Sequence, residues 1–149
     1  MGSGKKQILL ICGGNTCRSP MAKVILADKL KKASKLEAFM IDSAAYDYPT
    51  YQGASTNARK AIKQLFGEDL LVSHTAKKLT PDLVEGADLI LVMGAGMKKG
   101  LPQEKTWTLK EYVGETGDVV DPFDGNIDTY VTCAKEISSL LEKVLPKLG

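Results

Sequence analysis

Short apolar runs alternate with helical patterns along this chain. The first run, Ile8 to Ile11, is continuous and is typical of a strand buried on both faces. Three later apolar runs predict further strands, at 38–41, 88–93 and 106–109. Apolar positions that recur every three or four residues predict helices from Ser19-Pro20 to about residue 30, at 56–66 and at 128–148. A Thr-Pro-Asp start predicts a shorter helix at 80–85.

Strands that alternate with helices predict an α/β fold built on a parallel sheet. We expect one three-layer domain over residues 1–149, with a four-stranded parallel sheet and helices on both faces. Residues 1–4 are left out of this fold. Ligands of such sheets bind beyond the carboxyl ends of the strands. The sequence predicts these ends at Cys12, Ser43, Met93 and Leu109.

The composition is that of an ordinary globular chain, with 44% hydrophobic and 26% charged residues. A net charge of +2 is too small to indicate binding to nucleic acid or to a membrane. The sequence has no signal-peptide pattern and no apolar run of about 18 residues. Its three cysteines, an odd number, do not form the disulfide framework of a secreted protein. We therefore expect a monomeric cytoplasmic protein.

The stretch after the first strand, Cys12-Gly13-Gly14-Asn15-Thr16-Cys17-Arg18-Ser19-Pro20, has the features of an anion site. Its two glycines suit a tight turn, and Ser19-Pro20 is typical of a helix start. Backbone N–H groups and the helix dipole favour an anion there, and Arg18 can hold two phosphate oxygens. A thiolate at Cys12 would be stabilised by the helix end, Arg18 and Ser19, and would be a nucleophile. The alternative is a structural cysteine beside a chance arginine.

These nine residues resemble the signature of the low-molecular-weight protein tyrosine phosphatase family, in which Cys and Arg are five residues apart and Ser-Pro follows. A second motif, Asp121-Pro122-Phe123, extends the resemblance over almost the whole chain. By itself an Asp-Pro pair favours a turn, but the resemblance implies that Asp121 is the general acid. Asp118 and Asp124 are weaker alternatives. The resemblance implies a hydrolase that forms a phosphocysteine intermediate, acts on phosphorylated proteins and needs no metal or other cofactor.

The resemblance also implies roles for the other residues of the loop. We expect the substrate to contact Arg18, Phe123 and the loop residues Gly13, Gly14, Asn15, Thr16 and Cys17. Asn15 is expected at a positive φ, in hydrogen bonds with two supporting residues, Ser43 and His74. A merely structural role for His74 is equally compatible with the sequence. Two further points stay open: whether Cys17 pairs with Cys12 in a reversible disulfide, and whether Tyr48 or Tyr51 flanks the substrate.

Thr16 bears on which phosphorylated residue is the substrate. The tyrosine enzymes of the family usually have Ile or Leu at this place, and its bacterial protein-arginine phosphatases have Thr. A guanidinium would leave hydrogen bonds unmade against an aliphatic side chain, whereas a hydroxyl can pair with it. The segments 108–113 and 117–123 also look like the arginine subgroup, although Asp124 departs from the small residue expected there. We therefore expect phosphoarginine, with phosphotyrosine as the alternative.

Three other functions fit the sequence less well. A thiol-linked arsenate reductase needs a further cysteine pair, and this chain has only Cys17 and Cys133 besides Cys12. A non-catalytic anion-binding module would be expected to lose the nucleophile or the acid, and both are present. The stretch Gly94–Gly100 resembles a dinucleotide fingerprint, but its third glycine is one residue late. No residues have the spacing of metal ligands.

Overall fold

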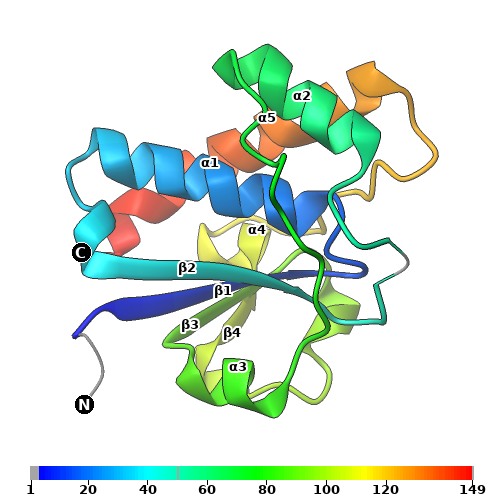
Figure 1. The fold of residues 1–149 in the computed structure, drawn as a ribbon. Coiled ribbons are helices and arrows are strands. Elements are labelled where there is room, and N and C mark those ends of the chain that lie inside the picture. The colour runs from blue at the N-terminus through cyan, green and yellow to red at the C-terminus, as the bar shows by residue number, and fades with distance from the viewer. Residues whose placement is uncertain (1–3, 50, 149) are drawn as a thin grey trace.

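The computed structural model describes residues 4–49 and 51–148, so residues 1–3 of the excluded N-terminal stretch lie outside it. Four parallel strands form one sheet in the order β2-β1-β3-β4 (Figure 1). The strands are β1 (Lys6–Cys12), β2 (Phe39–Ala45), β3 (Leu89–Val92) and β4 (Thr106–Thr108). The helices are α1 (Arg18–Lys32), α2 (Thr56–Phe66), α3 (Pro81–Gly86), α4 (Leu109–Tyr112) and α5 (Ile127–Val144). Short 3-10 turns are η1 (Leu36–Ala38), η2 (Ala95–Lys98), η3 (Gln103–Lys105) and η4 (Leu145–Lys147).

The two faces of the sheet carry layers of unequal thickness. Alternate side chains of β1 point to opposite faces, as the two-residue period of a strand requires. Ile8 and Leu10 pack with residues of α1, α2 and α5 in the larger core. Leu9 and Ile11 join a smaller cluster with residues of α3 and η2 on the other face. Helices α1 and α5 cover the upper side of the sheet in Figure 1 and α3 lies below it, which confirms the three-layer α/β fold.

The order of the strands determines where a ligand can bind. β1 has β2 on one side and β3 on the other. The chain therefore runs from β1 to one side of the sheet and, after β2, crosses to the other side. In doubly wound sheets such a reversal opens a crevice at the carboxyl ends of the strands. The stretch 12–18 starts at this point, because Cys12 is the last residue of β1 and Arg18 is the first of α1.

Several predicted boundaries were wrong. Helix α1 begins at Arg18, with Cys17 in the N-cap position, so Ser19 is not the cap. β2 continues past Ser43 to Ala45, and β3 ends at Val92, one residue before Met93.

The C-terminal half differs in two places. β4 stops at Thr108, because the Thr108 hydroxyl and Glu111 form a capping box that starts α4 at Leu109. α5 ends at Val144, and Pro146, which has no N–H for a helical bond, lies in the 3-10 turn η4 that follows.

Candidate active site

The loop from Cys12 to Arg18 is held by backbone hydrogen bonds from two other segments. The N–H groups of Tyr46 and Asp47 donate to the carbonyls of Cys12 and Gly13 at 2.8 and 2.9 Å. The N–H of Ser55, the N-cap of α2, donates to the Thr16 carbonyl at 2.8 Å. The loop is therefore fixed along its length by the segment after β2 and by the start of α2.

Cys12 and Arg18 are both buried within this loop. Only 1% of Cys12 is exposed, and its Sγ lies 3.0 Å from Ser19 Oγ. The Ser19 hydroxyl therefore contacts the Cys12 sulfur and does not cap the helix, contrary to the sequence prediction. Because a hydroxyl can donate a hydrogen bond to a thiolate, Ser19 is placed to stabilise the anionic form of the sulfur.

Arg18 connects the loop to the segment that contains Asp121. Its Nη1 donates to the Val119 carbonyl at 2.9 Å, and its Nη2 lies 3.5 Å from Asp121 Oδ2. The third nitrogen, Nε, is buried and has no hydrogen-bond partner among the described residues. A buried N–H of a guanidinium is costly to leave unpaired. The geometry therefore leaves the Nε donor of Arg18 available for an anion.

Asp121 lies beside the loop, although it is about a hundred residues away in the sequence. Its carboxylate is half exposed, and Oδ1 accepts a hydrogen bond from the Phe123 N–H at 3.0 Å. The Cys17 thiol lies 3.7 Å from the same oxygen. Burial, together with negative charge at Cys12 and Asp121, raises the pKa of Cys17 to about 12, so Cys17 stays protonated at neutral pH.

Among the described residues, the two alternative acids form no ion pair with Arg18. Asp118 accepts a hydrogen bond from the Ala95 N–H at 3.0 Å, at the start of η2. Asp124 occupies a turn with φ of 70°. Of the three aspartates, Asp121 is the one that pairs with Arg18.

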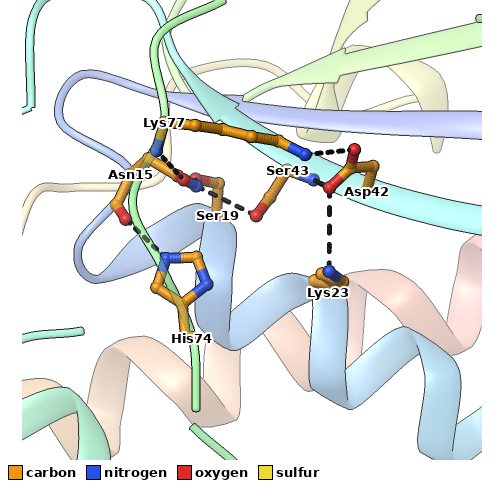
Figure 2. Close-up of polar contacts among 7 residues, drawn as sticks. All are labelled: Asn15, Ser19, Lys23, Asp42, Ser43, His74 and Lys77. Atoms are coloured by element: carbon orange, nitrogen blue, oxygen red, sulfur yellow. Dashed lines mark hydrogen bonds and ion pairs between the residues drawn. The ribbon is translucent and has the colours of Figure 1, made fainter. Parts of the chain in front are cut away.

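The rear of the loop is held by side chains that meet at Asn15, as Figure 2 shows. Asn15 has φ of 57°, the conformation that the sequence predicted. Its Nδ2 donates to Ser19 Oγ at 2.8 Å and to Ser43 Oγ at 2.9 Å, and its Oδ1 accepts from the Lys77 N–H at 3.1 Å. His74 Nε2 lies 2.8 Å from the Asn15 carbonyl. The expected contacts of Asn15 with Ser43 and His74 are therefore present.

Two shifted pKa values describe the charge state of this rear network. Burial lowers the pKa of His74, and the positive charges of Lys23 and Lys77 lower it further. A neutral His74 protonated on Nε2 can donate to the Asn15 carbonyl. Burial acts to raise the pKa of Asp42, but hydrogen bonds from the Lys77 amine and the Ser43 N–H outweigh it and lower the pKa. Asp42 is therefore a carboxylate between two lysines (Figure 2).

Tyr48 and Tyr51, the two candidates to flank the substrate, are both exposed. Tyr48 and Tyr51 are 82% and 56% exposed, and the Lys78 amine lies 5.4 Å from the centre of the Tyr48 ring. Phe123, two residues after Asp121, is 56% exposed.

All three cysteines are free thiols, so Cys12 and Cys17 are not joined by a disulfide in this structure.

Two further contributions to the site were not predictable from the sequence. The Val119 carbonyl and the Lys77 N–H are backbone groups, and no side-chain pattern marks them. Their positions follow from the tertiary structure alone.

Comparison with known proteins identifies the family. Residues 7–149 match the family model described as low molecular weight phosphotyrosine protein phosphatase. The chain belongs to this family. The phosphatase is thus a hydrolase of phosphorylated proteins.

Relatives of this phosphatase include enzymes named for two different substrates. The protein-arginine phosphatase of Bacillus subtilis (strain 168) is 36% identical, and the match covers 95% of each chain. The crystal structure of a low molecular weight protein tyrosine phosphatase from T. tengcongensis is also 36% identical, with a TM-score of 0.88 over 96% of this chain and 99% of that one. A structure of the YwlE arginine phosphatase, a cysteine-to-serine mutant with a phosphorylated active-site serine, is 35% identical, with a TM-score of 0.84 over 95% of each chain. None of the helices in the described part of the phosphatase is long and apolar enough to span a membrane.

Proposed function

We propose that this phosphatase removes the phosphoryl group from phosphoarginine residues of proteins through a phosphocysteine at Cys12. The observation that carries the proposal is the geometry of Arg18. Its buried guanidinium has a free Nε donor, it lies in the same short loop as the Cys12 sulfur, and its Nη2 is 3.5 Å from an acid. Nucleophile, anion donor and proton donor are the three groups that a two-step phosphoryl transfer needs.

The first step is attack of the Cys12 thiolate on phosphorus. The phosphoryl oxygens bind Arg18 and the backbone N–H groups of residues 13–18, at the start of α1, where the helix dipole favours negative charge. Asp121 donates its proton to the leaving nitrogen as the bond to phosphorus breaks. Ser19, 3.0 Å from the sulfur, stabilises the thiolate before attack and when it leaves again.

The second step returns the enzyme to its starting state. Asp121, now a carboxylate, takes a proton from a water molecule that attacks the phosphocysteine, and phosphate leaves. The phosphorylated serine of the YwlE mutant supports a covalent intermediate of this kind. Because the nucleophile must remain a reduced thiol, we place the protein in the reducing cytoplasm.

Thr16 supports phosphoarginine over phosphotyrosine. The residue is 8% exposed, its carbonyl is fixed by Ser55, and its hydroxyl has no partner among the described residues. That hydroxyl can pair with a guanidinium N–H, for which an aliphatic side chain has no partner to offer. Phosphotyrosine is the second candidate, because a structural relative of equal identity is a tyrosine phosphatase.

The test compares one phosphoarginine peptide and one phosphotyrosine peptide of matched sequence. We expect the wild-type protein to have the higher kcat/KM for phosphoarginine. We expect Thr16→Ile to lower the ratio of the two values about tenfold, the effect of losing about one hydrogen bond to a charged group. Thr56→Val, an exposed change at the start of α2, is the matched control and should leave the ratio unchanged. A wild-type preference for phosphotyrosine would contradict the proposal.

A further inference from the structure

A second acid, Asp47, lies at the phosphate loop and has no part in the two chemical steps. It follows β2 and is exposed. A Cβ atom on Gly13 would lie 3.8 Å from Asp47 Oδ2 and 4.0 Å from Arg18 Nη2. The Asp47 carboxylate and the Arg18 guanidinium are therefore on the same side of Gly13, at the phosphate loop.

The backbone holds Asp47 in this place. Its N–H donates to the Gly13 carbonyl at 2.9 Å, and the preceding Tyr46 N–H donates to the Cys12 carbonyl at 2.8 Å. Tyr46 is fixed in turn, because its hydroxyl donates to the Lys99 carbonyl at 2.7 Å and its own carbonyl accepts from the Lys78 amine at 2.8 Å. Asp47 is therefore attached to the loop itself, and its backbone is held beside Gly13.

The carboxylate of Asp47 has no ion pair and no hydrogen bond within the described part of the chain. Asp121, by comparison, is paired with Arg18. An unpaired carboxylate beside a phosphate site repels the phosphoryl group, and this cost falls on every substrate. It is offset only for a substrate that brings a positive charge close to its phosphorus.

Phosphoarginine has that charge and phosphotyrosine does not. The guanidinium of phosphoarginine is bonded directly to phosphorus and still has N–H groups that point away from it, whereas the ring of phosphotyrosine is neutral. A carboxylate is the best acceptor for a guanidinium, through two parallel hydrogen bonds. We propose that Asp47 determines specificity by binding the guanidinium of phosphoarginine, an inference that rests on the function proposed above.

The experiment measures kcat/KM of Asp47→Asn on matched phosphoarginine and phosphotyrosine peptides. The change keeps the size of the side chain and removes its charge. We expect kcat/KM for phosphoarginine to fall about tenfold, which corresponds to about 1.4 kcal/mol, and kcat/KM for phosphotyrosine to stay the same or rise. The difference should shrink as salt approaches 1 M, where the Debye length is only about 3 Å.

Two controls separate this inference from others. Glu68→Gln removes one exposed negative charge just beyond the C-terminal end of α2 and should leave both values unchanged. Thermal unfolding should show Asp47→Asn to be as stable as the wild type. Equal losses on both peptides would mean a structural role and would overturn the inference, as would an unchanged ratio in a wild-type protein that prefers phosphoarginine. A wild-type protein that does not hydrolyse phosphoarginine would contradict the proposed function itself.

Discussion

The front and the rear of the phosphate loop differ in how completely their polar groups are paired. At the rear, Asn15 uses its Nδ2, Oδ1 and carbonyl oxygen in hydrogen bonds with Ser19, Ser43, Lys77 and His74. At the front, the Nε of Arg18 and the carboxylate of Asp47 are unpaired within the described residues, and Asp121 is half exposed. The polar groups at the rear have hydrogen-bond partners within the protein, and those at the front are available to a substrate.

The paired groups at the rear stabilise the loop, and the unpaired groups at the front are available for the reaction. A fully paired buried network makes the conformation of the loop unique, because any other arrangement leaves polar groups without partners. Groups held in place but left unpaired are ready to bind charge that appears during a reaction. Substitutions at the front should therefore affect turnover alone, and substitutions at the rear should affect both turnover and folding.

Cys12→Ser should have the largest effect and act on turnover alone. A serine hydroxyl is a far weaker nucleophile than a thiolate, so we expect kcat with p-nitrophenyl phosphate to fall by at least about 10⁴-fold. Phosphate binding, measured by calorimetry, should persist because Arg18 and the backbone donors are unchanged. Cys133→Ala, a buried cysteine on α5, is the control and should stay active. Full activity of Cys12→Ser would end the cysteine mechanism.

Asp121→Asn should have the next largest effect, again without loss of stability. Removing the proton donor should lower kcat about 10²- to 10³-fold on phosphoarginine peptide, and less on p-nitrophenyl phosphate, whose leaving group hardly needs a proton. Asp124→Asn makes the same chemical change three positions away, at a positive φ that Asn tolerates, and should keep its activity. Equal losses on the two substrates would indicate that Asp121 only shapes its turn.

Asn15→Ala should have the smallest effect on turnover but should also destabilise the fold. It leaves Ser43, Ser19 and the Lys77 N–H without their partner and puts alanine at φ of 57°. We expect a loss of about 2–4 kcal/mol in the free energy of unfolding, seen as a fall of about 5–12 °C in Tm. Asn15→Gly relieves the backbone strain and should recover about 1 kcal/mol of it. A variant as stable as the wild type would show that the rear network is dispensable.

The loop was predictable from the sequence because its parts are contiguous. A strand, two glycines, a cysteine and an arginine within eleven residues are sufficient to indicate an anion site, and the Asn15 conformation follows from residue type. The start of α1 was not predictable from Ser19, because that hydroxyl is used by Cys12 and Asn15 instead of the helix end. A side chain with two possible uses cannot be assigned until its neighbours in space are known.

The residues that come from elsewhere in the chain were harder to predict. Asp121 was found by the family resemblance and not by its pattern, since Asp-Pro is a common turn pair. Asp47 had no signal, because an acid in a loop rich in tyrosine is typical of a solvated surface. What distinguishes it is a backbone hydrogen bond to Gly13, and such bonds follow from the pairing of β1 with β2.

The hydrogen bond from Arg18 to the Val119 carbonyl joins residues that are 101 positions apart. The other segments that hold the loop lie before residue 78, whereas the proposed proton donor, Asp121, comes from the segment before α5. Hydrolytic rate should therefore report on whether the last third of the polypeptide has docked against the loop.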